Sequence, residues 1–151
     1  MKKVIILCSL IMYVPLILLG CATTPKFTPL PWGVKVVSPS PDLPKNITAF
    51  SGIWYGIWDN GRPTTLVVEK IKPPEASVIY SWGPLGKERE GGFNHHTGRI
   101  EPGKLTITNP ELGITINYLL SNGGEKLEGE FRVAKSIYYV TMRRQLPQSL
   151  H

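Results

Sequence analysis

The chain between Gly52 and Arg144 consists of short segments in which apolar and polar residues alternate, and strong turn signals separate these segments. Asn-Gly at 60–61 and 122–123, and Pro-Gly at 102–103, are typical of tight turns between antiparallel strands. A period of two residues predicts β-strands, and no segment keeps the period of a helix. The pattern predicts eight strands, at 52–59, 64–71, 75–82, 92–101, 104–109, 112–121, 125–134 and 136–144.

The alternation also assigns the two faces of each strand. Leu105 and Ile107, for example, share one face of their strand, and Thr106 and Thr108 share the other. The gaps between strands are short except at 83–91, and short gaps favour antiparallel neighbours. An apolar face needs a cover, and no helix is predicted to provide one. We therefore predict an all-β protein, a small eight-stranded antiparallel up-and-down β-barrel, because closing the sheet buries this face and removes open edges.

The first twenty residues have the pattern of a targeting segment. Lys2 and Lys3 form a basic start, and an apolar run from 4 to 19 follows them. A run of this length is also compatible with a membrane span. Its position at the very start, with a small residue and a cysteine directly after it, favours a cleaved signal peptide over residues 1–20. The alternative is a signal anchor with a cysteine at its end by chance.

The four residues Leu-Leu-Gly-Cys at 18–21 resemble the lipobox of bacterial lipoproteins. The resemblance implies cleavage before Cys21, a diacylglycerol on its sulfur, and a fatty acyl chain such as palmitate on the new N-terminus. Two or more acyl chains hold a protein stably on a membrane. Ala22, where an aspartate often marks inner-membrane retention, implies the outer membrane, with the protein facing the periplasm. Cys8 leaves with the signal, so no cysteine remains for a disulfide.

Residues 21–47 form a second segment, which follows the signal. It holds six prolines between 22 and 46 and is predicted to be an extended tether. Val34–Val37 could instead add an edge strand, and Trp32 could dock on the barrel. The barrel domain is expected at 48–145 and a disordered tail at 146–151. The chain has 17 basic and 11 acidic residues, and it loses two basic ones with the signal, so its net charge falls from +6 to about +4. This charge is too weak and scattered for nucleic-acid binding.

The predicted barrel resembles the calycin superfamily, which includes lipocalins, fatty-acid-binding proteins and avidins. The residues that carry the resemblance are Gly52-Ile53-Trp54 on the first strand and Arg143-Arg144 on the last. The resemblance implies that Trp54 packs under one of these two arginines. The start Gly-Ile-Trp-Tyr is also similar to the start of avidins. This chain is shorter than typical lipocalins and lacks their disulfide and C-terminal helix.

Aromatic residues on the inward faces form the candidate ligand site. The two glycines of the first strand, Gly52 and Gly56, leave room beside each indole for a crossing side chain or for a ligand. An eight-stranded barrel is just wide enough to be filled by side chains or to hold one small ligand. His96 or Arg99 is expected to orient the polar groups of the ligand. The predicted binding residues are Trp54, Trp58, Tyr80, Trp82, Tyr118, Phe131, His96 and Arg99.

The sequence carries no catalytic motif: it has no Gly-x-Ser-x-Gly elbow and no phosphate-binding glycine loop. His95 and His96 are adjacent on a strand and point to opposite faces, so they are not expected to share a metal. We therefore expect no enzyme activity, cofactor or metal. Two functions stay open. The barrel either binds a small apolar or amphipathic molecule or a glycan, or it is filled and binds an envelope protein through its outer face and the loop at 83–92.

Overall fold

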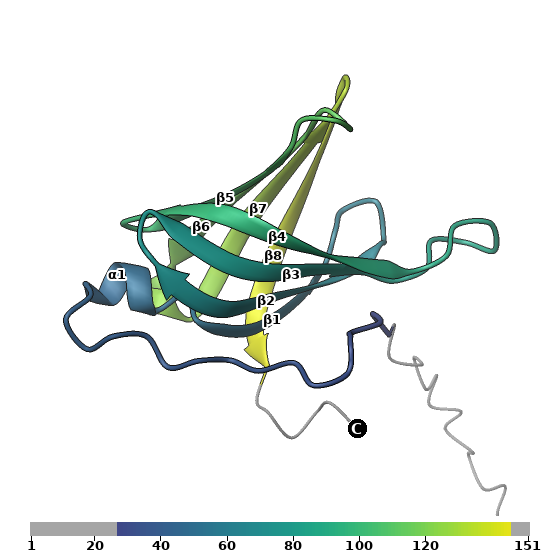
Figure 1. The fold of residues 1–151 in the computed structure, drawn as a ribbon. Helices are drawn as coiled ribbons and strands as arrows, with labels where there is room; N and C mark the ends of the chain where they lie inside the picture. The colour runs from purple at the N-terminus through teal and green to yellow at the C-terminus, as the bar shows by residue number, and fades with distance from the viewer. Residues whose placement is uncertain (1–26, 146–151) are drawn as a thin grey trace, which may run out of the picture.

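The computed structural model describes residues 27–145, and in them eight strands form one closed barrel in the order β1 to β8 (Figure 1). All neighbours are antiparallel, as the alternation and the short gaps predicted. The elements are α1 (Lys45–Thr48), β1 (Gly52–Ile57), β2 (Pro63–Lys72), β3 (Glu75–Trp82), β4 (Gly92–Glu101), β5 (Lys104–Asn109), β6 (Ile114–Ser121), the 3-10 turn η1 (Asn122–Gly124), β7 (Lys126–Val133) and β8 (Ser136–Gln145).

The predicted signal peptide, the lipid attachment at Cys21 and the tail at 146–151 lie outside the described residues. Within residues 27–145, the structure has no helix that is both long enough and apolar enough to cross a bilayer. In the same part of the chain, no three His, Cys, Asp or Glu side chains gather in a way that would hold a metal ion.

The two ends of the barrel differ. One end, here called the closed end, carries α1 and the turns at 73–74, 102–103 and 122–125. The other, the open end, carries the loops at 58–62, 83–91, 110–113 and 134–135. The ladder between β4 and β5 has only three residue pairs, whereas the ladder between β3 and β4 has eight. The walls β1–β4 and β5–β8 therefore diverge towards the open end (Figure 1).

Side chains fill the closed end. Phe50, just after α1, is fully buried there, and Ile47 within α1 is nearly so. The carbonyl of Asn46 accepts a hydrogen bond from the backbone N–H of Gly103 at 3.0 Å, which ties α1 to the turn between β4 and β5. The largest fully buried side chains of this half are Trp54, Leu66, Leu105, Tyr118, Leu127 and Met142. Large buried side chains therefore form the core of this half of the barrel.

Arg144 closes the seam between β1 and β8, which also has only three ladder pairs. Of the two arginines that the sequence left open, Arg144 lies over Trp54, with its guanidinium carbon 4.2 Å from the ring centroid. The guanidinium donates hydrogen bonds to the carbonyls of Ser51 and, at 2.7 Å, Ala49. A Cβ atom on Gly52 would lie 2.6 Å from this group. The space beside Trp54 is therefore taken by a crossing side chain and not by a ligand.

Gly56 lies four residues after Gly52 on the same strand, and it too leaves space for part of β8. A Cβ atom there would lie 2.6 Å from Cγ2 of Val140 and 2.9 Å from the carbonyl oxygen of Thr141. The glycine lets β8 approach β1 closely, because any larger residue would meet the backbone of β8. Both glycines of the first strand thus serve the closure of the barrel.

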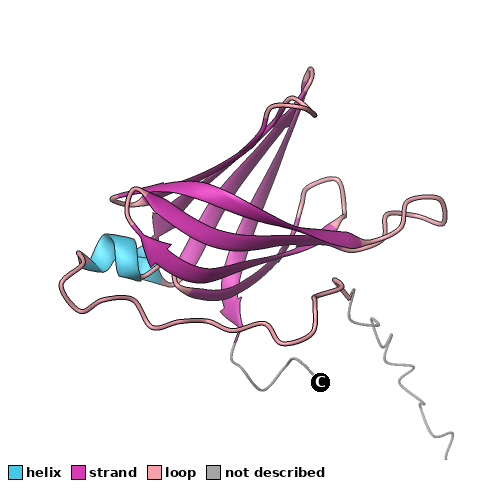
Figure 2. Cartoon of the chain, in the orientation of Figure 1, coloured by secondary structure: helices cyan, strands magenta, loops and turns pink. Residues whose placement is uncertain are grey.

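Residues 27–44 form a strap that runs along the outside of the barrel to α1 (Figure 2). Its first residues bind β2 and β3: the Thr28 and Thr65 hydroxyls are 2.6 Å apart, and the Ser81 hydroxyl donates to the carbonyl of Pro29. Leu30 and Val34 pack on an outward apolar cluster made of Ile53, Val67 and Ile79. From residue 27 onward the proline-rich segment is therefore part of the domain and not a free tether.

Two minor expectations about this segment also differ from the structure. Val34–Val37 adds no strand, and its backbone makes one bond to the sheet, from the N–H of Val37 to the carbonyl of Glu69 at 2.7 Å. Trp32 does not dock, since its side chain is fully exposed. The strap is held mainly by side-chain contacts, such as those of Leu30 and Val34 with the outward apolar cluster.

Removing the side-chain contacts between the strap and the outward apolar cluster should destabilise the barrel. Replacing Leu30 and Val34 together with alanine should lower the free energy of unfolding by roughly 1–3 kcal/mol, because each half-buried side chain loses part of its transfer free energy. Urea unfolding of the full chain measures this change. The control is Lys35→Ala on the exposed side of the strap, which should have no effect. Equal stability of both variants would show that the strap is not held.

Candidate functional site

The open half of the barrel contains a cavity of about 360 Å3. This volume lies at the lower end of the ~300–1,000 Å3 that is usual for small-molecule sites. All its lining residues come from the open ends of the strands and from the loops there. They are Trp58, Asn60, Arg62, Tyr80, Trp82, Leu85, Arg89, Asn94, His96, Ile107, Asn109, Leu112, Ile114, Ile116, Phe131, Val133 and Tyr138.

Aromatic rings meet across the interior of the barrel. Tyr80 on β3 stacks on Phe131 on the opposite strand β7, with ring centroids 6.4 Å apart. Trp58 meets Phe131 edge to face at 5.7 Å, and Trp82 lies 5.8 Å from Tyr80. Tyr138 on β8 completes the group at 6.2 Å from Phe131. These rings give the cavity one rigid wall with large apolar faces.

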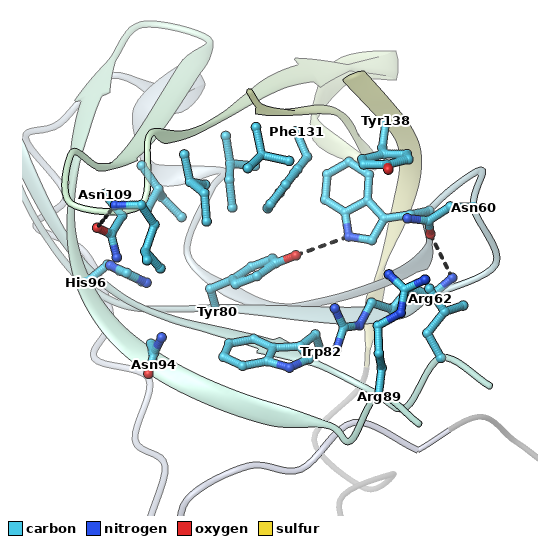
Figure 3. A pocket seen from close by; sticks show the side chains of 17 residues that line it. Asn60, Arg62, Tyr80, Trp82, Arg89, Asn94, His96, Asn109, Phe131 and Tyr138 are labelled. Atoms are coloured by element: carbon cyan, nitrogen blue, oxygen red, sulfur yellow. Dashed lines mark hydrogen bonds between the residues drawn. The ribbon is translucent and has the colours of Figure 1, made fainter. Parts of the chain in front are cut away.

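The polar atoms within this wall are mostly paired. The indole N–H of Trp58 donates to the hydroxyl of Tyr80 at 3.2 Å (Figure 3). Burial raises the pKa of Tyr80, so its hydroxyl stays protonated at neutral pH. Deeper in the core, the hydroxyl of Tyr118 has no hydrogen-bond partner among the described residues, and burial raises the pKa of this group well above its usual value. Such a buried orphan group costs stability.

Two arginines make one side of the mouth positive. Arg62 and Arg89 lie next to each other beside Trp82 (Figure 3). Arg62 donates from Nε to the carbonyl of Gly83 and from one terminal nitrogen to the carbonyl of Glu90, both at 3.0 Å, so it also holds the loop between β3 and β4. Burial, opposed in part by Tyr80 and aided by Arg89, lowers the pKa of Arg62, but an arginine stays charged at neutral pH.

The rest of the lining is aliphatic or neutral. Ile107 on β5 and Ile114 and Ile116 on β6 supply the aliphatic part, and Ile116 pairs with Phe131 of the aromatic group. Asn109 uses its side-chain oxygen to accept from the N–H of Leu112 at 3.2 Å, which shapes the loop between β5 and β6. No aspartate, glutamate, lysine, serine, threonine or cysteine lines the cavity. The site is therefore apolar with a net positive rim, and it lacks the usual pairs of nucleophile and base.

The structure brings five of the predicted binding residues together at the cavity: Trp58, Tyr80, Trp82, Phe131 and His96. Trp54 and Tyr118 are fully buried below it and do not line it. The prediction for Arg99 differs from the geometry. Its exposed side chain lies on the outer face and pairs with Glu101 at 3.2 Å, because an odd position on β4 points away from the face that carries His96.

Several lining residues were missed by reasoning from the sequence. Tyr138 and Ile116 follow the inward alternation of their strands, so the pattern itself could have identified them. Arg62 and Arg89 lie in or next to loops, where no periodic pattern exists. Nothing in the order of residues shows that these two loops meet.

Acidification should weaken the open half of the barrel through His96. Burial, and secondarily the charge of His95, lowers the pKa of His96, so its protonated form is less favourable in the folded state than in the unfolded chain. The unfolded chain then binds more protons below about pH 6.5, and stability falls as the pH drops through the lowered pKa. Urea unfolding at about pH 7 and about pH 5 should show a small loss that is absent in His96→Gln. An equal loss in the variant would assign it to other groups.

Comparisons with known proteins identify no family for this chain. No protein-family model matches the chain, and no curated protein matches it in sequence. Among solved structures, a protein described as the de novo design of a fluorescence-activating β-barrel is similar, with 12% identity and a TM-score of 0.49, over 68% of this chain and all of that one. Another, EF1p2_mFAP2b bound to DFHBI, has 12% identity and a TM-score of 0.43, over 67% of this chain and 98% of that chain. These matches are too distant to bear on a ligand.

Proposed function

We propose that this protein is a non-catalytic, lipid-anchored protein of the bacterial envelope whose barrel binds a small amphipathic molecule. The observation that carries the proposal is the cavity itself: about 360 Å3 in the open half, with aromatic and aliphatic walls and two arginines at its rim. The closed half supplies a rigid, filled base. A barrel that only displays an outer surface has no need for a hollow half.

The chemistry of the lining selects the kind of ligand. The isoleucines and aromatic rings favour an apolar or aromatic body. Arg62 and Arg89, with no carboxylate in the lining, favour a head group that is anionic or rich in acceptor oxygens. A glycan fits less well, because the sugar hydroxyls need acceptors as well as donors, and the lining holds no carboxylate. We therefore favour an amphipathic ligand with an acidic head group over a glycan.

The envelope location is inferred from the N-terminus. The basic start, the apolar run and the lipobox-like residues up to Cys21 support lipid attachment, and Ala22 supports the outer membrane with the barrel in the periplasm. The alternative function, a filled barrel that holds an envelope protein, is less well supported, because the open end of the barrel contains a cavity of about 360 Å3.

The test is to identify what the protein carries from its own membranes. The full chain is purified from membranes, its small molecules are extracted, and mass spectrometry compares the native protein with Trp58→Ala/Trp82→Ala. We expect a molecule with an apolar body and an acidic head group on the native protein, and a strong loss on the double variant. Equal amounts on both would show that the cavity is not the site. An empty native protein that also fails to bind the anionic probe anilinonaphthalene sulfonate would contradict the proposal.

A further inference from the structure

The chain reaches the barrel from its N-terminal side at the open end. A Cβ atom on Gly83, at the end of β3, would lie 2.6 Å from the carbonyl oxygen of Phe27. The next contacts, of Thr28 with Thr65 and of Pro29 with Ser81, involve the same ends of β2 and β3. The strap then runs to α1 at the closed end (Figure 2). Whatever lies before Phe27 is therefore attached beside the mouth of the cavity.

The distance to the predicted lipid is short. Phe27 is six residues after Cys21. Even fully extended, six residues span no more than about 20 Å. A lipid on Cys21 therefore keeps the rim of the cavity within roughly this distance of the bilayer surface. The closed end points away from the point of attachment.

Aromatic side chains are exposed on the same side of the barrel. Phe27 is 75% exposed and Trp32 is fully exposed. Phe93 on β4 is 37% exposed and pairs with Ser81, whose hydroxyl holds Pro29 of the strap. Leu30 and Val34 grip the barrel on either side of Trp32, so the indole is held outward by a fixed backbone. Exposed tryptophan and phenylalanine next to a lipid anchor are suited to the interface between lipid head groups and acyl chains.

We propose that Phe27, Trp32 and Phe93 form a membrane-contact surface that holds the strap side of the barrel, beside the mouth of the cavity, against the bilayer carrying the Cys21 lipid. The inference rests on the lipid anchor of the proposed function and adds an orientation to it. The strap acts as a rigid arm, because its residues are bound to β2 and β3 from Thr28 onward. The ligand then passes between the bilayer and the cavity without crossing the periplasm.

The test uses Trp32 as its own probe. Full-length protein with acylated Cys21, verified by its mass, is reconstituted into vesicles of phosphatidylethanolamine and phosphatidylglycerol. Part of the lipid carries bromine near the head group, which quenches indole fluorescence on contact. We expect the emission assigned to Trp32, taken as the difference between the native protein and Trp32→Phe, to lose most of its intensity. The same emission should resist quenching by iodide in the water.

A matched control moves the indole to the opposite wall. Leu119 is 52% exposed on β6, across the barrel from the strap. In a Trp32→Phe background, Leu119→Trp should give an emission that iodide quenches and brominated lipid does not. The proposal is overturned if Trp32 in the native protein behaves like this control, or if both positions are quenched equally by the lipid. A chain without acyl groups on Cys21 also overturns it.

The same experiment separates this inference from the proposed function. Trp58 and Trp82 line the cavity. Quenching by brominated lipid that persists in Trp32→Phe therefore reports lipid inside the barrel. Quenching of Trp32 without this remainder supports the membrane contact and contradicts lipid as the cavity ligand. If brominated lipid quenches the emission of Trp32→Phe but not the emission assigned to Trp32, the result supports lipid as the cavity ligand and contradicts the membrane contact.

Discussion

Replacing Trp54 with alanine should lower the free energy of unfolding by about 3–5 kcal/mol, the usual cost of removing a large buried aromatic side chain. Trp54 is fully buried in the closed half, and its indole N–H donates to the carbonyl of Phe50 at 2.8 Å. Its ring also lies beneath Arg144. The variant therefore loses at once the contacts of Trp54 with Phe50, just after α1, and with Arg144 on β8. Since domains of this size are stable by only about 5–15 kcal/mol, the variant should lose a large share of its stability and unfold at a clearly lower temperature.

The control for this prediction is Trp32→Ala. The same type of side chain is removed, but from a fully exposed position on the strap. The change in the free energy of unfolding should stay within about 0.5 kcal/mol. Thermal and urea unfolding of both variants measure the difference. Similar stability of Trp54→Ala and the native protein would mean that Trp54 does not hold the closed end together.

Filling the mouth of the cavity should abolish ligand binding and leave the fold intact. Val133 is half-buried at the end of β7, pairs with Ile114 and lines the cavity. Val133→Trp places a large ring in the hollow half, where there is space for it. We expect affinity for the ligand to fall by more than about tenfold, which corresponds to about 1.4 kcal/mol. Displacement of anilinonaphthalene sulfonate from the full chain provides the readout.

Ile137→Trp is the matched control for Val133→Trp. Ile137 lies near the start of the adjacent strand β8, but its side chain points outward and is 43% exposed. Its replacement adds the same ring close to the same end of the barrel without entering the cavity. Affinity should be unchanged. Equal loss in both variants would indicate a general disturbance of the open end, and no loss in either would place the ligand elsewhere.

These predictions follow from a division of the barrel along its axis. The closed half is packed with large side chains and covered by α1, so substitutions there should act on stability. In the open half the two walls diverge after the short ladder between β4 and β5, so substitutions there should act on binding. From the sequence alone, a filled barrel and a hollow one were alternatives. The structure contains both, one at each end.

Most of the strand pattern could be read from the residues. All eight predicted strands are present, with ends that differ by a few residues, as at β1, which ends at Ile57 and not at 59. The inward positions followed from the period of two, because a strand exposes alternate side chains to opposite faces. Tyr80, Trp82, Phe131 and His96 reach the cavity for this reason. Ile79 is an instructive case: the period of two in 75–82 places it on the outward face, yet the strap buries it completely.

What the sequence could not predict depends on contacts between distant segments. The strap was expected to be free, because its composition shows only that it cannot form a helix. Its grip depends on Leu30 and Val34 meeting an outer cluster that three strands build together. Arg62 follows the turn after β1, and Arg89 lies in the loop after β3. The two arginines meet because the barrel brings both of these loops to its open end.

By itself, the sequence determined the class of fold, the number of strands and the side-chain face of most strand positions. The lipid signal up to Cys21 is also read from the sequence alone, and it stays a prediction. These properties are local, since they depend on periods of two residues, on turns and on one short motif. Only the tertiary structure decided which arginine covers Trp54, how much of the interior is hollow and where the strap lies. These properties depend on how the side chains of separate strands fill a shared volume, and no local pattern contains that information.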